Sequence, residues 1–169
     1  MSEMLGIVGW KNSGKTTLVA ALVAEFTHRG LLVSTVKHAH HAFQLDQDGT
    51  DTAKHRKAGA HEVAIVSNNR WAIMHEIESS GEEPSLHSMV SKMAPCDLII
   101  VEGYKNSSIP QVEVLRAEST TQEPLWKTNK NVFAVASDQT VAECVKPQFN
   151  LDDVENLADY ITQILGLRT

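Results

Sequence analysis

The residues Gly9-Trp10-Lys11-Asn12-Ser13-Gly14-Lys15-Thr16 match the phosphate-loop pattern G-x-x-x-x-G-K-[ST] without a mismatch. The apolar run 5–8 before them predicts a buried strand, and residues 16–29 after them have the apolar spacing of an amphipathic helix. In this context the loop wraps the phosphates of a nucleotide with backbone N–H groups at the start of a helix. A glycine turn with an exposed lysine is the alternative, and it leaves the flanking strand and helix unexplained.

Each fixed position of this loop has a physical role toward a phosphate chain. Gly9 and Gly14 leave room for the turn and for close approach of the phosphates. Lys15 adds a positive charge at the β- and γ-phosphates, the Thr16 hydroxyl is a ligand for Mg²⁺, and Thr17 can donate a further hydrogen bond. The predicted nucleotide-binding residues are Gly9, Lys11, Asn12, Ser13, Gly14, Lys15, Thr16 and Thr17.

The residues around the loop predict the fold class. Gly30 suits the end of the first helix, and the run 31–36 after it predicts a second strand. Strand, helix and strand in alternation predict an α/β P-loop NTPase fold with three layers and a mostly parallel sheet. The runs 63–66 and 71–74 flank four turn residues and predict an inserted β-hairpin. No repeat or linker is visible, so residues 1–169 are expected to form a single nucleotide-binding domain.

The other elements follow from apolar spacing and capping residues. Thr50 or Asp51 is expected to cap a short helix that ends near Gly59, and Asn150 to cap the last helix. Pro84 suits the first turn of a further helix. Additional strands are predicted at 98–101, 112–115 and 132–136.

The strand predicted at 98–101 ends on a candidate metal ligand. Glu102 follows it directly, as the acidic residue of a magnesium-nucleotide site follows a strand that neighbours the phosphate loop. Asp97 precedes the strand, at the wrong end of a parallel sheet, and is expected to be a loop residue. Lys105 lies just beyond Glu102 and is either a contact to an anionic ligand or a surface lysine.

A histidine-rich segment, Lys37-His38-Ala39-His40-His41, follows the second predicted strand. The carboxyl ends of parallel strands line the ligand crevice, so this segment is expected to face the nucleotide. His38, His41 and Asp51 are candidate contacts to phosphate or to a partner, and Asp46 is a candidate Mg²⁺ ligand. The histidines also suggest a metal site, although adjacent histidines do not easily face one ion.

Composition excludes several classes of protein. A net charge of −6 argues against a nucleic-acid binder, which needs a broad basic surface. The chain shows neither a signal peptide nor an apolar run long enough to span a membrane, so no membrane partner is expected. The two cysteines form no CxxC pair and are expected to be reduced thiols of a cytoplasmic protein.

The histidine-rich segment and the segment around Glu102 together are typical of one protein family. The phosphate loop occurs in many families, whereas the histidine-rich segment combined with Val101-Glu102-Gly103-Tyr104-Lys105 resembles the MobB family of molybdopterin-guanine dinucleotide biosynthesis adapters. The resemblance covers nearly the whole chain. It is carried by Gly9 to Thr17, Lys37 to His41, Asp46, Gly49 to Asp51, Ala58 to Ala60, Val101 to Lys105, Ile109 to Arg116 and Leu151 to Ile161.

The resemblance implies a function that spacing alone does not. Members of the family bind GTP with Mg²⁺, hydrolyse it slowly and assist a MobA-type guanylyltransferase that attaches GMP to molybdopterin. They are homodimers built partly through an extended β-region, which here corresponds to the predicted hairpin. Carried over to this chain, the resemblance implies that Thr16, Glu102 and Asp46 serve Mg²⁺ and that His38 lies at the nucleotide.

Three other functions stay open at the level of sequence. A small-molecule kinase shares the phosphate loop, a metal-delivery GTPase would use the histidines, and a purely structural module would need neither. The guanine preference rests on the resemblance, because Asn129-Lys130 resembles the start of the guanine-reading N-K-x-D motif but Val132 occupies the Asp position.

Overall fold

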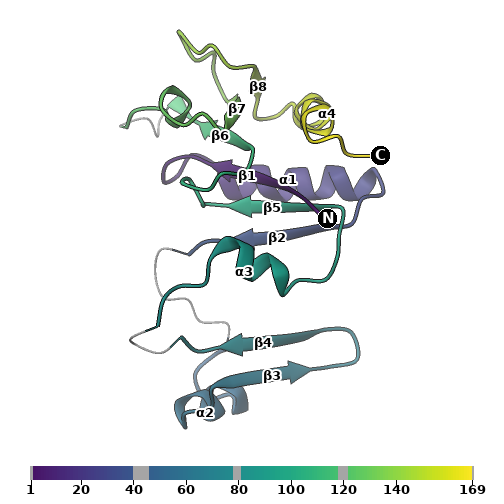
Figure 1. Ribbon diagram of the computed structural model, residues 1–169, viewed down its shortest axis with the longest axis vertical. Helices are drawn as coiled ribbons and strands as arrows, with labels where there is room; N and C mark the ends of the chain where they lie inside the picture. The colour runs from purple at the N-terminus through teal and green to yellow at the C-terminus, as the bar shows by residue number, and fades with distance from the viewer. Residues whose placement is uncertain (1, 40–45, 78–80, 118–121, 169) are drawn as a thin grey trace. The chain divides into compact units, whose positions relative to one another are not determined.

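The computed structural model describes residues 2–39, 46–77, 81–117 and 122–168. They form two compact units, residues 1–38 with 92–169, and residues 39–91. Each unit has its own secondary structure (Figure 1). The prediction of a single domain over 1–169 stays a prediction.

The first unit is built on a parallel sheet of six strands in the order β2-β5-β1-β6-β7-β8. All the strand pairs of this sheet are parallel. The strands are β1 (Glu3–Val8), β2 (Val33–Lys37), β5 (Leu98–Glu102), β6 (Gln111–Leu115), β7 (Val132–Ser137) and β8 (Gln148–Asn150). This arrangement confirms the α/β class and the mostly parallel sheet.

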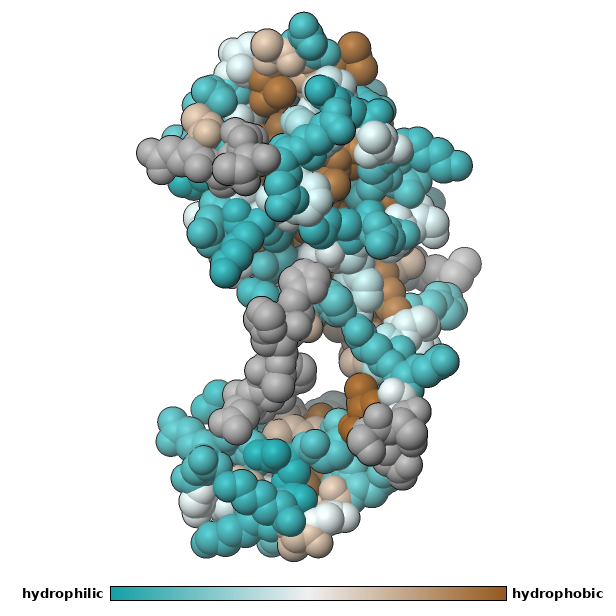
Figure 2. Space-filling view, turned by 90° about the vertical axis from the view of Figure 1, so that its left-hand side faces the viewer, coloured by the Kyte–Doolittle hydropathy of each residue, from teal (hydrophilic) through white to brown (hydrophobic). Residues whose placement is uncertain are grey.

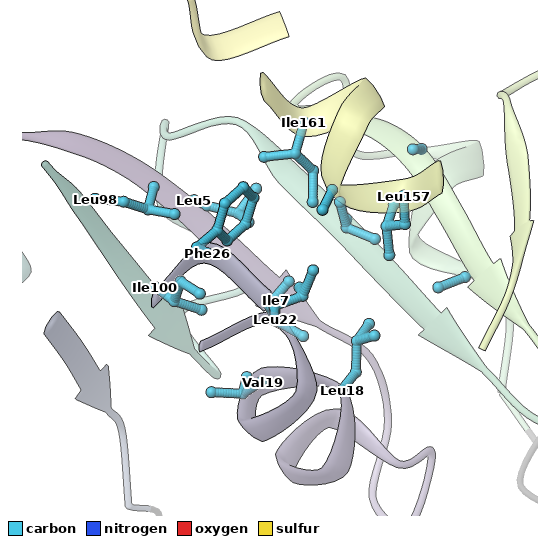
Figure 3. Close-up of a cluster of buried hydrophobic side chains, with 14 of the residues drawn as sticks. Leu5, Ile7, Leu18, Val19, Leu22, Phe26, Leu98, Ile100, Leu157 and Ile161 are labelled. Carbon is cyan, nitrogen blue, oxygen red and sulfur yellow. The ribbon is translucent and has the colours of Figure 1, made fainter. Parts of the chain in front are cut away.

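Two helices pack on this sheet and close the core. Helix α1 (Lys15–His28) contributes Leu22 and Phe26, which are completely buried, and α4 (Val154–Leu165) contributes Leu157 and Ile161. Figure 3 shows these side chains gathered with those of β1 and β5. Because the core holds β1 and α1 together, it fixes the loop that joins them.

The strand register places the candidate residues along one edge of the sheet. Lys37 at the end of β2 and Ile7 near the end of β1 both lie opposite Glu102 at the end of β5. On the other side of β1, Val8 lies opposite Glu113 of β6. The carboxyl ends of these strands therefore meet at the phosphate loop.

The second unit contains the inserted hairpin. Strands β3 (Glu62–Val66) and β4 (Trp71–His75) pair antiparallel, with Val66 opposite Trp71, and this confirms the predicted hairpin. Thr50 caps α2 (Asp51–Lys57) by accepting the Ala53 N–H at 3.4 Å. The unit ends with the short helix α3 (Leu86–Ser91), near the position predicted from Pro84.

Two predicted boundaries were displaced. Asn150 does not cap the last helix: it ends β8, and the Asp153 side chain accepts the Asn156 N–H instead. Leu151 was misleading because it packs against the core although it lies before the helix. The second strand begins at Val33, since Leu32 is held by the loop residue Asp97, whose Oδ2 accepts the Leu32 N–H at 2.7 Å.

The surface of the first unit is mainly hydrophilic on the face that Figure 2 shows. Across the described ranges, no helix has the length and apolar character that crossing a membrane would require. Cys96 and Cys144 are free thiols, each partly buried.

Candidate functional site

The phosphate loop runs from Gly9 to Thr16 between β1 and α1. Gly9 has φ 146° and Gly14 has φ 95°, backbone conformations that favour glycine. A Cβ atom at Gly9 would lie 2.5 Å from the Val114 carbonyl oxygen, and one at Gly14 would lie 2.9 Å from Nε of Arg116. Gly9 is thus required by the close approach of β6 as well as by the turn, whereas Gly14 is required mainly by its backbone conformation.

The loop contains a buried polar group that has no partner within it. Ser13 is 1% exposed, and its Oγ forms no hydrogen bond with any part of the chain that the structure describes. A buried hydroxyl without a partner costs free energy unless a ligand supplies one. Lys11 and Asn12 are exposed on the loop, and Thr17 is exposed in the first turn of α1.

Lys15 bends back over the loop. Its ammonium donates a hydrogen bond to the Trp10 carbonyl oxygen at 2.6 Å. Burial lowers the pKa of Lys15, and the nearby charges of Lys105 and Lys37 act in the same direction, against the opposing effect of Glu102. Three cations near one loop form a local positive site in a chain of net charge −6, and this favours an anionic ligand.

Thr16 and Glu102 meet at the end of β5. The Thr16 hydroxyl donates to Oε1 of Glu102 at 2.8 Å, and Glu102 is only 8% exposed. The Lys37 ammonium lies 3.4 Å from the same Oε1 and 3.5 Å from the Thr16 hydroxyl oxygen. The structure therefore brings two of the predicted Mg²⁺ ligands together and adds a lysine that sequence reasoning did not single out.

These donor atoms fit a magnesium ion. A hydroxyl and a carboxylate oxygen are hard ligands of the kind that Mg²⁺ takes beside nucleotide phosphates. The Glu102 carboxylate is largely buried, and the partly exposed Lys37 forms an ion pair with it. A divalent cation at the same position would satisfy both oxygens.

Lys105 stands over the second residue of the phosphate loop. Its ammonium is 4.0 Å from the ring centroid of Trp10, and the Trp10 indole N–H donates to the Glu123 carbonyl oxygen at 3.0 Å. A cation above an indole face is attracted by the ring. Lys105 therefore lies at the loop, and its contact with an anionic ligand stays a prediction.

A buried amide holds the segment that carries Lys105. Gln111 is completely buried, and its Nε2 donates to the carbonyl oxygens of Tyr104 at 3.3 Å and Ser107 at 3.1 Å. Asn129 donates to the Lys105 carbonyl oxygen at 3.0 Å. The Asn129 side chain thus positions the segment that carries Lys105. Asn129 itself precedes β7, as the sequence indicated.

Glu113 organises a neighbouring segment from inside the sheet. It is completely buried, and its two carboxylate oxygens accept the N–H groups of Leu125 and Trp126, each at 2.7 Å. These residues begin the short 3₁₀ helix η2 (Leu125–Lys127). Burial raises the pKa of Glu113, against the two backbone hydrogen bonds.

His38 lies beside the acidic residue. The backbone N–H of His38 donates to the Glu102 carbonyl oxygen at 2.9 Å, and the imidazole ring lies 4.9 Å from the Tyr104 ring, centroid to centroid. His41 lies outside the described residues. Within the described ranges, no group of three histidine, cysteine or acidic side chains is placed to hold a metal ion.

Asp46 and Asp51 belong to the second unit. Asp46 accepts a hydrogen bond from Arg56 at 3.0 Å, and Asp51 pairs with Lys54 at 3.1 Å. Their predicted roles toward Mg²⁺ and phosphate stay predictions.

Sequence reasoning missed Lys37, Arg116 and Glu113. Lys37 ends β2 as Glu102 ends β5, so the rule that singled out Glu102 applies to it as well. Arg116 follows β6 at the same edge of the sheet. The sequence around Glu113 alternates polar and apolar residues, as a strand does. It does not indicate that the Glu113 carboxylate accepts two backbone N–H groups of Leu125 and Trp126.

Comparisons with known proteins converge on one family. The model of the family described as "Molybdopterin guanine dinucleotide synthesis protein B" (MobB) matches residues 4–138. The molybdopterin-guanine dinucleotide biosynthesis adapter protein of Escherichia coli (strain K12) is 34% identical over 165 residues, covering 96% of this chain and 93% of its own. The adapter protein of the same name from Haemophilus influenzae is 34% identical over 158 residues, 94% of this chain and 86% of its own.

A solved structure gives the same result for the fold. The crystal structure of a MobB protein homolog from Bacillus stearothermophilus superposes with a TM-score of 0.71 at 25% identity. The superposition covers 98% of this chain and 99% of that one.

Proposed function

The chain belongs to the MobB family, and on this basis we propose that it is a GTP-binding adapter that assists the conversion of molybdopterin to molybdopterin guanine dinucleotide. The observation that carries the nucleotide part is the meeting of Thr16 with Glu102, 2.8 Å apart at the mouth of the phosphate loop. The adapter part is supported by the relatives, whose names describe that role.

Each residue of the site has a task in this proposal. Backbone N–H groups of the loop and the start of α1 bind the phosphates, and Lys15 leaves the Trp10 carbonyl to meet the β- and γ-phosphates. Thr16 and Glu102 hold Mg²⁺, which when bound neutralises charge between those phosphates. Ser13 finds in the ligand the hydrogen-bond partner that it lacks among the described residues.

Slow hydrolysis suits an adapter, because an adapter acts through its nucleotide-bound state and not through the GDP and phosphate that hydrolysis releases. We therefore propose at most a slow GTPase, acting in the cytoplasm with Cys96 and Cys144 reduced. The partner is a MobA-type guanylyltransferase. The adapter acts when it binds both the nucleotide and this enzyme.

The exposed hairpin supports a homodimer. Val66, Trp71 and Ile73 are 78%, 72% and 56% exposed, and the register of β3 and β4 places all three on one face. Clustered apolar side chains in solvent indicate a protein interface. We propose that a second copy of this chain covers this face.

The decisive experiment is reconstitution of dinucleotide formation from a MobA-type enzyme, molybdopterin and Mg-GTP. Adding the wild-type chain should raise the yield, whereas Lys15→Ala should not, because it removes the charge that holds the phosphates. Calorimetry on the same samples should show tight Mg-GTP binding for the wild type alone.

Two results would contradict this proposal. Equal GTP affinity of Lys15→Ala and wild type would remove the phosphate-loop assignment, and no effect of the wild type on yield would remove the adapter role. Rapid ATP turnover that depends on an added acceptor would indicate a small-molecule kinase instead. Tight, stoichiometric uptake of Zn²⁺ or Ni²⁺ in dialysis would indicate metal delivery.

A further inference from the structure

The phosphate end of the site fixes the direction in which a bound nucleotide runs. Thr16 and Glu102 meet on the β5 side of β1, so an Mg²⁺ ion that they hold would lie on that side with the γ-phosphate. On the other side of β1 stand β6 and then β7. Since the phosphates occupy the loop, the sugar and base must extend along the sheet edge away from β5, toward the ends of β6 and β7. This step rests on the proposed nucleotide function.

Two polar residues stand at that edge. Arg116 follows β6, and its Nε lies 2.9 Å from the position of a Cβ at Gly14, so the edge is continuous with the phosphate loop. Asp138 follows β7, two strands away from β1. Two strand spacings are about 9.6 Å, comparable to the reach of a nucleoside from its α-phosphate.

The Asp138 carboxylate is oriented by the backbone. Its Oδ1 accepts the Ala117 N–H at 3.1 Å, which ties the end of β7 to the end of β6. Over the ranges that the structure describes, no hydrogen bond to Oδ2 is found. The side chain is exposed, but β7 beneath it is buried from Ala134 to Ala136. This carboxylate has one oxygen held by the backbone and the other accessible to a ligand, at the end of a buried strand, and such an arrangement is suited to reading a ligand.

The chemistry of this group selects one base. Guanine presents two adjacent N–H donors, at N1 and at the 2-amino group, and a carboxylate accepts such a pair in bidentate fashion. Oδ1 retains a lone pair for one of them beside its bond to Ala117. Adenine presents a lone pair at N1, which a carboxylate repels. We propose that Asp138 is the residue that reads the guanine base.

The Asn129-Lys130 pair does not fill this role. Asn129 lies before β7, at the opposite end from Asp138, and its amide group donates to Lys105 and to Oε1 of Gln111 at 2.8 Å. Its donors are therefore spent on the segment beside the phosphate loop.

The test changes the hydrogen-bonding groups that residue 138 presents to the base. In Asp138→Asn, an amide N–H₂ replaces one carboxylate oxygen and faces the donors of guanine, so Mg-GTP affinity should fall about 10- to 100-fold, as expected for an unpaired polar contact. Xanthosine triphosphate carries an oxygen in place of the 2-amino group, and its affinity should rise in the variant. Calorimetry with Mg²⁺ and GTP, xanthosine triphosphate or ATP measures both changes.

The matched control is Asp152→Asn, an exposed aspartate that follows the next strand, β8. It should bind all three nucleotides as the wild type does, and thermal melting should show both variants folded. If the wild type prefers GTP and Asp138→Asn keeps that preference, the assignment of Asp138 is overturned while the proposed function stands. If the wild type itself fails to bind GTP, both are overturned.

Discussion

At the scale of single residues, Lys37 is the unexpected member of the site. Its ammonium lies within 3.5 Å of Thr16 and Glu102, two of the three predicted Mg²⁺ ligands, and thus stands where an ion bound to those two oxygens would be. A tethered cation of this kind neutralises the Glu102 carboxylate when no metal is bound. It must also move aside, or onto a phosphate, when a metal arrives.

Replacing Lys37 with Met should make the site easier for Mg²⁺ to enter. The free Mg²⁺ concentration for half-maximal GTP binding should fall about 3- to 10-fold, which corresponds to the loss of one partly exposed ion pair. Titration of Mg²⁺ at fixed GTP, followed by calorimetry, measures this. Lys130→Met, an exposed lysine with the same change of charge, should leave the midpoint where it is. An unchanged or higher midpoint in Lys37→Met would show that the two cations do not compete.

At the scale of elements, one buried carboxylate connects the sheet to η2. Glu113 accepts both of the first N–H groups of this helix, and the preceding Glu123 carbonyl receives the Trp10 indole N–H. A strand, a 3₁₀ helix and the phosphate loop are thereby linked through a few hydrogen bonds. The position of Trp10 depends on this chain of contacts.

The titration of Glu113 should appear in the pH dependence of stability. Because burial raises its pKa in the folded state, the folded protein holds this proton more tightly than the unfolded chain does. Its contribution to the free energy of unfolding is therefore fully present below the unfolded pKa and is lost as pH rises through the folded value. The difference in unfolding free energy between wild type and Glu113→Gln should therefore decline as pH rises above the ordinary range of a glutamate, about pH 4.

Urea denaturation followed by circular dichroism gives this difference. A wild-type advantage over Glu113→Gln that grows with pH would reverse the sign and contradict the effect of burial.

The limits of sequence reasoning also lie at the scale of elements. Apart from β8, which the sequence did not predict, the strands, the hairpin and the position of Glu102 were predictable, because apolar spacing and the carboxyl-edge rule are local signals. The start of α4 was not, since Leu151 is apolar for reasons of tertiary packing while Asp153 supplies the cap. The contacts of Glu113 and Gln111 were also out of reach, because they join segments that only the fold brings together.

At the scale of the whole molecule, the apolar hairpin face predicts the assembly. Trp71→Glu places a charge in the face formed with Val66 and Ile73 and should convert the proposed dimer to a monomer, as measured by sedimentation velocity. Val145→Glu introduces the same charge at an exposed apolar residue of the first unit and should leave the dimer intact. Equal sedimentation of the two variants would exclude this face as the interface.

The contact between Lys105 and Trp10 has an optical consequence. Indole emission responds to a nearby charge and to the hydrogen bond of its N–H, and Trp10 has both within the phosphate loop itself. A triphosphate that draws Lys105 from the ring, or shifts the loop against Glu123, changes the surroundings of this chromophore. If the chain binds a nucleotide as proposed, the emission of Trp10 is therefore expected to report nucleotide occupancy without an added label.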